Sequence, residues 1–295
     1  MKKIGLALYD IFLYIKFKFK FKKKKVPEIE PLDITIKKIV EEHTSVSRFG
    51  DGELKWMLGE SPGYKFQKND KRIEERLKEV LISDNPKLLV CLPDVFISQK
   101  EFIRQNRMAW RTLLINNYDK WSKYFDFEKK YYDSNISRFY IDRRDKTQSE
   151  ERFNLVKQIW NHRNLVIVEG EFTEFGIGND LLKNSKSVRR VVCPSENAFD
   201  KYEELLKFFD TDYISTNDLI LIALGPTATI LAYDLSNLGY QAIDIGHLDI
   251  EYEWFLRKSR NRELIPGKYV NEVKDGDIVK KEINKEYEEQ IIKFI

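Results

Sequence analysis

Short apolar runs alternate with amphipathic segments along most of the chain, and this alternation predicts the secondary structure. Apolar residues at positions 73, 77, 80 and 81 have helical spacing. The apolar runs around Val46 and Val90 are too short for helices and are typical of buried strands. In the first half of the chain we predict a helix over 33–42, a strand over 45–50, a helix over 69–83, a strand over 87–93 and helical structure over 99–132.

From residue 136 onward, strand-like and helix-like segments follow one another regularly. Strands are predicted at 136–141, 164–170, 187–194, 218–224 and 240–246. Helices are predicted at 149–162, 198–209 and 226–239, and another is predicted to open at 176–182. Near-continuous apolar strands separated by helices are typical of an α/β fold with a mostly parallel sheet and helices on both faces.

The two ends of the chain depart from this pattern. Residues 1–25 combine an apolar run, interrupted by Asp10, with alternating Lys and Phe and then a run of lysines. The run is too short to span a bilayer, and no small-residue cleavage site marks it as a secretory signal. It suits the surface of an anionic membrane; the alternative is a basic tail without such a role. A linker is predicted at 27–31, and the charged C-terminal region is expected to hold a hairpin around 274–276.

Composition fits a globular protein and argues against nucleic acid binding, a disulfide and a structural zinc site. Of the 295 residues, 42% are hydrophobic and 34% are charged, and the net charge of +3 gives no global field that would attract nucleic acid. Cys91 and Cys193 both lie in apolar runs, so buried thiols in a reducing compartment are favoured over a disulfide. With three histidines and no Cys/His cluster, a structural zinc site is not expected.

Asp51 and Glu53 stand one residue apart directly after the first predicted central strand, and Gly50 and Gly52 flank Asp51. Glycine permits a tight bend, and carboxylate oxygens suit Mg²⁺ or Mn²⁺, which often bridge to substrate phosphates. The alternative is a helix start in which Asp51 caps the helix and Glu53 lies in its first turn. On this motif alone, the helix start is the simpler interpretation.

Polar residues follow nearly every predicted strand, and ligands of open parallel sheets bind at the carboxyl ends of the strands. After the strand 218–224, Gly225 makes a turn, and Thr227 and Thr229 place hydroxyls beside the free amides of a helix N-terminus. This segment is a candidate phosphate site or a well-capped turn. Gly176 and Gly178 are too closely spaced for a dinucleotide fingerprint, and there is no Walker-type loop, so NAD-linked and ATP-hydrolysing functions are disfavoured.

His247, Asp249 and Glu251 form a second acidic cluster after the last predicted strand. They share a face if the segment is extended, whereas in a helix His247 pairs with Glu251. Either arrangement offers a metal ligand or a general base beside a phosphate site. The sequence does not rank the three.

Three arginines, Arg104, Arg107 and Arg111, have helical spacing in the region 99–132. A solvated basic face is the default interpretation of this pattern. A face that binds an anion is the alternative.

Five segments in order resemble the GT-D family of glycosyltransferases, which includes the glucosyltransferase domain that extends glycans on streptococcal serine-rich adhesins. The segments are RFGDGE at 48–53, GIGNDLL at 176–182, CPSENAFDKY at 193–202, ALGPTATILAYDL at 223–235 and QAIDIGHLDIEYEW at 241–254. The resemblance implies a Rossmann-like fold of the GT-D type with a single catalytic domain. That domain covers 30–260, between a basic and aromatic extension, 1–29, and a charged extension, 261–295, that packs on it.

The resemblance further implies a nucleotide-sugar donor such as UDP-glucose and a divalent cation, Mn²⁺ or Mg²⁺, held by an Asp-x-Glu motif that matches Asp51 and Glu53. Residues assigned to donor binding are Arg48, Gly52, Gly178, Asn179, Pro194, Asn197, Gly225, Thr227 and Thr229. The acceptor hydroxyl needs a base, which Glu251, Asp249 or His247 is expected to supply. Where Ser-Arg is expected before the Gly-x-Gly stretch, this chain has Thr173-Glu174, so a cation expected near the diphosphate or the acceptor is absent there.

The predicted function is therefore a metal-dependent transfer of a hexose, with glucose favoured, from a UDP-sugar to a glycan acceptor on a protein or a lipid carrier. The protein is expected in the cytoplasm, peripheral on the inner face of the cell membrane through residues 1–25. No nucleic acid partner is expected, and a homo-oligomer is left open. Two alternatives remain: another nucleotide-binding phosphotransferase, and a non-catalytic partner subunit with the same fold.

Overall fold

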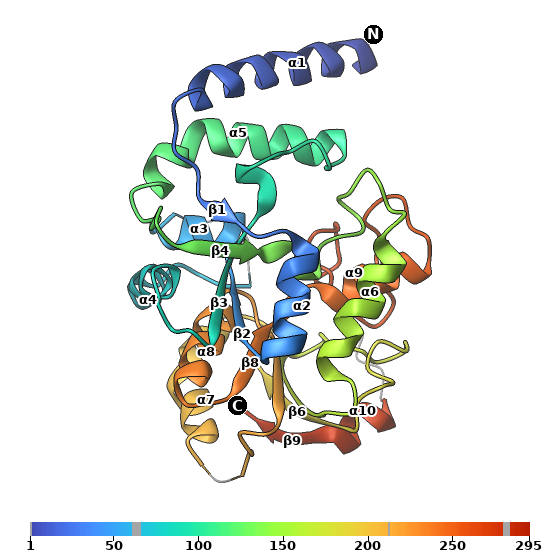
Figure 1. Ribbon diagram of the computed structural model, residues 1–295. Coiled ribbons are helices and arrows are strands. Elements are labelled where there is room, and N and C mark those ends of the chain that lie inside the picture. The colour runs from blue at the N-terminus through green and yellow to red at the C-terminus, as the bar shows by residue number, and fades with distance from the viewer. Residues whose placement is uncertain (1, 61–65, 212, 280–283) are drawn as a thin grey trace.

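The computed structural model describes residues 2–60, 66–211, 213–279 and 284–295. Within these residues, nine strands form one sheet in the order β1-β4-β3-β2-β8-β7-β5-β6-β9, and every neighbouring pair is parallel (Figure 1). The strands are β1 Glu28–Ile29, β2 Ser45–Arg48, β3 Leu88–Leu92, β4 Lys130–Asp133, β5 Asn164–Gly170, β6 Ser187–Cys193, β7 Leu219–Ala223, β8 Gln241–Asp244 and β9 Ile291–Phe294. The predicted parallel α/β fold is confirmed.

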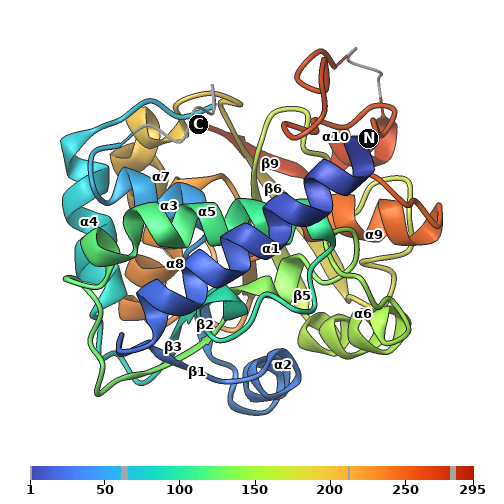
Figure 2. The same ribbon diagram turned by 90° about the horizontal axis from the view of Figure 1, so that it is seen from above.

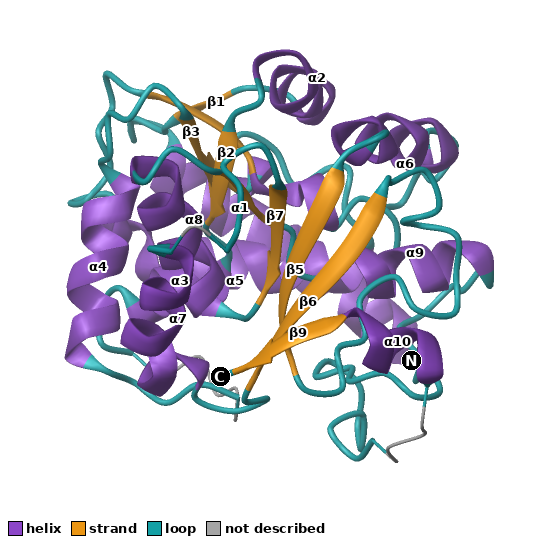
Figure 3. Cartoon of the chain, turned by 90° about the horizontal axis from the view of Figure 1, so that it is seen from below, coloured by secondary structure: helices purple, strands orange, loops and turns teal. Residues whose placement is uncertain are grey.

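Helices cover both faces of this sheet (Figure 3). The α-helices of the described residues are α1 Lys2–Phe21, α2 Leu32–Glu42, α3 Asp51–Trp56, α4 Lys71–Leu81, α5 Arg104–Trp121, α6 Ser149–Lys157, α7 Tyr202–Phe209, α8 Pro226–Asn237, α9 Leu248–Leu256 and α10 Lys285–Gln290. Helices α3, α4, α5, α7 and α8 enclose one hydrophobic core with the sheet, and α2, α6 and α9 enclose another.

The apolar strands follow from this two-sided burial. Successive residues of a strand point to opposite faces, so β3 contributes Leu88, Val90 and Leu92 to one core and Leu89 and Cys91 to the other. All five side chains are buried, which is why the run is apolar throughout instead of alternating. The two cores supply the main driving force for folding.

One predicted strand is wrong, and the strand that precedes it, β4, is missing from the predictions. Residues 136–141 are not a strand of the sheet: they pass through a 3-10 turn and a loop, from which Phe139 packs into the core. The strand here is β4, at the end of the region 99–132 that was expected to be helical, because α5 already ends at Trp121. Strand β4 begins with the exposed Lys130 and mixes charged and aromatic residues, so it lacks the apolar run of a central strand.

Three shorter segments also differ from expectation. Residues 176–182 form turns and not the start of a helix, because their two glycines have φ angles of +76° and +79°, which a right-handed helix does not continue. The hairpin expected around 274–276 is a loop, closed by a 2.8 Å hydrogen bond from Val270 N to Gly276 O. The linker 27–31 contains the short strand β1.

Both extensions of the chain join the main fold. Strand β9 adds to the edge of the sheet beside β6, and α10 leads into it. Helix α1 lies across α5, on the far side of α5 from the sheet (Figure 2). The N-terminal helix therefore covers Arg107 and Arg111, whereas Arg104 stays largely exposed.

Candidate active site

A cavity of about 480 Å³ lies at the carboxyl ends of the central strands. Its wall is formed by the turns after β2, β5, β6, β7 and β8 together with one side of α5. The predicted site residues in this wall are Arg48, Asp51, Gly52, Glu53, Pro194, Gly225, His247 and Asp249. The predicted residues that do not line it are Gly178, Asn179, Asn197, Thr227, Thr229 and Glu251.

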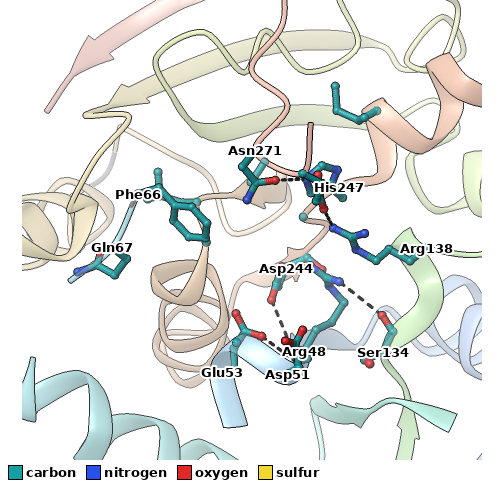
Figure 4. Close-up of a pocket in the computed structure, with 18 of the residues that line it drawn as sticks. Arg48, Asp51, Glu53, Phe66, Gln67, Ser134, Arg138, Asp244, His247 and Asn271 are labelled. Carbon is teal, nitrogen blue, oxygen red and sulfur yellow. Dashed lines mark hydrogen bonds and ion pairs between the residues drawn. The ribbon is translucent and has the colours of Figure 1, made fainter. Parts of the chain in front are cut away.

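Arg48 at the end of β2 and Asp244 at the end of β8 form an ion pair beside the cavity (Figure 4). Arg48 Nη2 donates to Asp244 Oδ1 at 2.7 Å, and Nε donates to the main-chain oxygen of Asp244 at 2.7 Å. Nη1 donates to Ser137 Oγ at 2.6 Å. Burial raises the pKa of Asp244, and the charge of Arg48 opposes this rise. The guanidinium of Arg48 therefore already has protein partners on all three nitrogens.

Position 246 favours glycine, because a side chain there would displace the guanidinium of Arg48. The φ of Gly246, +46°, is in the left-handed region, and a Cβ atom there would lie 1.9 Å from Arg48 Nη2. The missing side chain lets the guanidinium lie against the backbone where β8 turns into α9. Gly246 thus permits the contact between Arg48 and the end of β8.

Asp51 and Glu53 lie in the first turn of α3, whose N-cap is Gly50. Glu53 Oε2 accepts a hydrogen bond from Gly50 N at 2.8 Å, and Asp51 Oδ2 lies 3.2 Å from Lys55 Nζ. Burial raises the pKa of Glu53 to about 7, and the nearby charge of Asp244 adds to the rise. The hydrogen bond between Glu53 and Gly50 N is the one expected at a helix start, the alternative interpretation of this motif. The residue that makes it is Glu53, however, and not Asp51. The metal-binding role stays a prediction.

The donor chemistry of these carboxylates fits a divalent cation. Among the side chains that the structure describes, no three His, Cys, Asp or Glu residues are grouped around one metal position. Mg²⁺ and similar ions nevertheless bind through one or two carboxylates, with waters and substrate phosphates as the other ligands. Burial is the main cause of the raised pKa of Glu53, and the charge of Asp244 adds to it by repelling the ionised carboxylate. A cation held by Asp51 and Glu53 would relieve that repulsion.

The turn before α8 places Gly225 in the cavity wall and both threonines behind it. Gly225 has φ +54° and ψ −143°, and the ring of Phe66 packs against it. Thr229 Oγ1 donates to the main-chain oxygen of Arg48 at 2.9 Å. Thr227 is fully buried, and its hydroxyl has no hydrogen-bond partner among the described residues. The helix N-terminus therefore reaches the cavity through the backbone at Gly225.

His247 lines the cavity, but both of its ring nitrogens are enclosed (Figure 4). Nε2 lies 3.1 Å from Asn271 Oδ1 and 2.9 Å from Glu272 Oε2. Nδ1 is buried and has no hydrogen-bond partner in the described part of the chain. The ring is thus held by the loop that follows residue 270.

Asp249, in the first turn of α9, binds the turns at residues 176–182 to the cavity wall through hydrogen bonds. Its Oδ1 accepts hydrogen bonds from Gly176 N at 3.0 Å and from Asn179 Nδ2 at 2.8 Å, and Oδ2 pairs with Lys268. Asn179 thus positions the turn, while Gly178 is exposed outside the cavity wall. Their donor-binding roles stay predictions.

Glu251 faces the opposite loop. Its Oε2 accepts hydrogen bonds from Tyr140 N at 2.9 Å and Ile141 N at 3.0 Å, and burial raises its pKa to about 7. The general-base role predicted for Glu251, Asp249 and His247 stays a prediction. The contacts of all three favour a positioning role.

The turn after β6 contributes Pro194 to the cavity and Asn197 to its support. Asn197 has φ +51°, and its Oδ1 accepts a hydrogen bond from Lys68 N at 2.9 Å. Its own N donates to Phe66 O at 2.7 Å. Asn197 therefore anchors the segment that carries Phe66 into the cavity wall.

Several charged residues of the wall are missing from the sequence predictions. Arg138 pairs with Glu272, and Arg262 Nη2 donates to both oxygens of Asp142 at 2.8 Å. Burial alone would raise the pKa of Glu272, but the charges of Arg138 and His247 outweigh it and hold the pKa below its ordinary value. These residues come from irregular loops without periodicity, so no pattern marks them.

Glu171 is the described carboxylate of the cavity wall whose side chain forms no hydrogen bond or ion pair. It follows β5, and its side chain is exposed. The sequence does place Glu171 directly after a predicted strand, as expected for a site residue. It does not show, however, that Glu171 and not the nearby Glu169 reaches the cavity. Glu169 is instead fully buried, 2.5 Å from Arg190 Nη1.

The fold and the cavity together define a Rossmann-like α/β protein with an acidic ligand site at the carboxyl edge of its sheet. The family model "Glycosyltransferase GT-D fold" matches residues 46–273. This match spans most of the sequence, so the chain belongs to the GT-D-fold glycosyltransferase family. The resemblance drawn from the five sequence segments is confirmed.

Two curated relatives share this region. The chain is 34% identical to "Glycosyltransferase GlyD" of Streptococcus pneumoniae serotype 4 over 252 residues, which cover 83% of this chain and 30% of that protein. It is 35% identical to "Probable glycosyl transferase Gly" of Streptococcus gordonii over 264 residues, which cover 88% and 38%. The chain thus spans about a third of the length of these relatives.

Solved structures share the fold. One, described as "The highly conserved domain of unknown function 1792 has a distinct glycosyltransferase fold", has a TM-score of 0.87 and 36% identity, covering 96% of this chain and 99% of its own. Another, "A New Glycosyltransferase (DUF1792) from Streptococcus sanguinis", has a TM-score of 0.85 and 34% identity, with coverage of 91% and 99%. The GT-D fold predicted for this chain is therefore confirmed.

Proposed function

We propose that this chain is an active, metal-dependent glycosyltransferase that moves a hexose, with glucose favoured, from a UDP-sugar to a glycan acceptor on a protein or a lipid carrier. The observation that carries the proposal is the position of Asp51 and Glu53. They lie in the wall of the cavity at the carboxyl edge of a GT-D-fold sheet.

Charge explains how such a cavity accelerates transfer. Cleavage of the sugar–phosphate bond leaves a nucleoside diphosphate with growing negative charge, and stabilising that charge lowers the barrier. A Mn²⁺ or Mg²⁺ ion bound by Asp51 and Glu53 would supply positive charge at this point. The backbone at Gly225 presents the N-terminal end of α8, whose dipole favours an anion. The turn that contains Pro194 is proposed to hold the base and ribose.

The opposite wall of the cavity suits the acceptor. Helix α5 presents Gln105, Asn106 and Trp110 to the cavity, and the two amide side chains make no hydrogen bond to described residues. Amides pair with sugar hydroxyls, and an aromatic ring packs on the apolar face of a sugar. Arg138 and Arg262 also line the cavity, each paired with a carboxylate, whereas Thr173, at the departure from the expected Ser-Arg, lies beside Gly170 and the turn of Pro194. We assign the acceptor glycan to the side of the cavity that α5 forms.

A base near the acceptor completes the reaction. Glu171 is proposed for this role, because its carboxylate lines the cavity and no described side chain binds it. It would take the proton of the acceptor hydroxyl as the new bond to the sugar forms. A cytoplasmic location is proposed as well, since Cys91 and Cys193 are buried free thiols, as suits a reducing compartment.

The test of donor binding is a thermal unfolding series with Mn²⁺ and UDP, separately and together. A ligand that binds only the folded state increases the free energy of unfolding, by about 2.7 kcal/mol at a hundredfold excess over Kd, and so raises the midpoint temperature of unfolding. We expect a shift that needs both ligands and is lost in Asp51→Asn/Glu53→Gln, which keeps an acceptor for Gly50 N. No shift in the parent would overturn the proposal.

The chain contains a matched control for this variant. Asp126 and Glu128 form a second Asp-x-Glu pair, on the surface and outside the cavity wall. Asp126→Asn/Glu128→Gln is expected to keep the full shift. Release of UDP from UDP-glucose with an acceptor glycan then tests transfer, whereas turnover of a nucleoside triphosphate would support a phosphotransferase instead.

A further inference from the structure

Helix α1 has two apolar faces, and only one of them is covered by the protein. Leu13 and Phe17 are buried against α5 and the core. Asp10, on the same face, pairs with Arg107 Nη2 and Arg111 Nη1 of α5, each at 2.6 Å. These contacts fix the rotation of α1 about its own axis, so the orientation of the other face is set by the fold.

The outer face of α1 is a continuous apolar stripe. Leu8, Ile11, Phe12, Ile15 and Phe19 have helical spacing, and their side chains are 49–80% exposed. Leu6, Tyr9 and Tyr14 are exposed elsewhere on α1, and outside this helix the exposed large apolar side chains of the described residues lie scattered over separate elements, such as Ile82 and Leu256. A contiguous exposed apolar patch marks an interaction surface.

Lysines frame this stripe. With about 3.6 residues per turn, Lys16 and Lys18 project on either side of it, and Lys22 and Lys23 follow at its C-terminal end. All four are exposed, and none pairs with a carboxylate in the part of the chain that the structure describes. Three other lysines of this segment, Lys20, Lys24 and Lys25, are paired with carboxylates of the body of the protein.

We propose that the outer face of α1 binds the surface of a lipid bilayer that contains anionic lipids. The apolar stripe would enter the boundary between headgroups and acyl chains, and the lysines would contact the anionic headgroups from both sides. Two copies of this face would bring their lysines together without any compensating carboxylate, which disfavours a second chain as the occupant. In this arrangement α1 would lie along the surface of the bilayer. No helix among the described residues is long and apolar enough to cross a membrane.

The same geometry orients the cavity. Helix α5 lies between α1 and the cavity, with Arg107 and Arg111 facing α1 and Trp110 lining the cavity (Figures 1 and 2). Helix α1 is the outermost element on this side of the molecule (Figure 1). A bilayer against α1 would therefore lie on the acceptor side of the cavity.

The test is sedimentation of the full chain with large vesicles of phosphatidylcholine, with and without about 30% phosphatidylglycerol. We expect binding to the anionic vesicles only. Phe12→Gln/Ile15→Gln/Phe19→Gln removes the stripe but keeps good helix formers, and is expected to weaken binding by about tenfold or more. Lys16→Gln/Lys22→Gln/Lys23→Gln is expected to weaken it about fivefold per lysine at low salt.

A matched control variant replaces exposed apolar residues by Gln at positions outside α1. Ile34, Ile82 and Leu256 are 47%, 58% and 45% exposed, so Ile34→Gln/Ile82→Gln/Leu256→Gln removes a comparable apolar area. It is expected to bind anionic vesicles like the parent, and both variants are expected to unfold at the parent's midpoint. Equal binding of the parent and the stripe variant would overturn the proposal. The proposal would also be overturned if the parent formed a concentration-dependent dimer, which the stripe variant did not form, and did not bind the vesicles.

Discussion

Arg48 Nη2 donates to Asp244 Oδ1 at 2.7 Å and thereby joins two halves of the sheet. In the described residues, β2 and β8 share a single register pair, Val46 with Ile243, so their backbone pairing is sparse. The side chain of Ser45 adds two hydrogen bonds to the backbone at the start of β8. Side chains therefore hold the place in the sheet where the cavity opens.

Removing either partner of this pair is expected to destabilise the fold. Arg48→Met leaves Asp244 buried near Glu53 without its counter-ion and is expected to cost about 3–5 kcal/mol, whereas Asp244→Asn keeps an acceptor and costs less. Urea unfolding of both variants and of the double variant measures the effect. A double variant that is as unstable as the sum of the single variants would show that the pair is not coupled.

Gly246→Ala is expected to disrupt the same contact. The new Cβ would lie 1.9 Å from Arg48 Nη2, and the φ of +46° adds strain. Gly178→Ala is the matched control, because its φ is +79° but no atom lies within 4 Å of its Cβ position. We expect about 1 kcal/mol of destabilisation in the control and at least about 2 kcal/mol more in Gly246→Ala, from thermal unfolding.

Glu251 is expected to make stability decrease with pH. Burial raises its pKa from 4.5 to about 7 in the folded chain, with the charge of Arg138 opposing and that of Asp142 adding. The folded state then binds more protons than the unfolded state between these values, so this residue's contribution falls as pH rises from about 4.5 to 7. The decrease is of the order of 3 kcal/mol.

The variant Glu251→Gln isolates this effect, because it mimics the protonated carboxyl at every pH. The free energy of unfolding of the variant relative to the parent is expected to rise between pH 5 and pH 8 and to level off above. A constant difference across that range would show that Glu251 ionises at the same pH in both states. The comparison cancels the other groups with raised pKa values, such as Glu53 and Asp133.

Asp10→Asn is expected to loosen α1 from α5. Burial alone would raise the pKa of Asp10, but Arg107 and Arg111 outweigh it and lower the pKa, so the carboxylate stabilises the docked helix above its ordinary pKa. Without that charge, the buried Arg111 and the partly buried Arg107 repel each other. Trypsin is expected to cleave between Lys16 and Lys25 several-fold faster in the variant than in the parent, while the core unfolds nearly as before. Equal cleavage would mean that Leu13 and Phe17 suffice.

Glu171→Gln is expected to lower kcat by about a hundredfold and leave the binding of Mn²⁺ and UDP unchanged, as expected for a general base. Glu196→Gln is the control, because Glu196 is an equally charged, exposed residue in the next turn but does not line the cavity. Steady-state kinetics of both variants decides. An unchanged kcat in Glu171→Gln would return the role to one of the three residues of the α9 region.

The sequence predicts the sheet well because each central strand is buried on both faces and reads as an apolar run. It fails at β4 and β1, which lie toward one edge of the sheet and carry charged residues, and at 136–141, where buried side chains come from a loop. Strand β9 lies in the charged C-terminal region, where no strand over 291–294 was predicted. Its partner strand, β6, lies about a hundred residues earlier, and no local pattern reports such a pairing.

The candidate site was predictable only in outline. The strand-end turns mark the cavity edge, and the motif segments locate Asp51, Glu53, Gly225 and His247 in its wall. Side-chain partners were not predictable, because they depend on loops that meet only in the fold. Asp244 was visible as a lone acid within an apolar strand, yet its pairing with Arg48 required the strand order.

The strand order divides the molecule at one place in the chain. Strands β1 to β4 come from residues 28–133 and form one half of the sheet, and β5 to β9 come from 164–294 and form the other. The connection between them includes the largely exposed segment 144–148, while the cavity wall draws on both halves. A chain cut in this segment would give two fragments, each with an unbroken half-sheet and neither with a complete cavity. If each fragment were fused to one of two proteins that bind each other, their association would bring the fragments together. Recovery of ligand binding would then report the interaction.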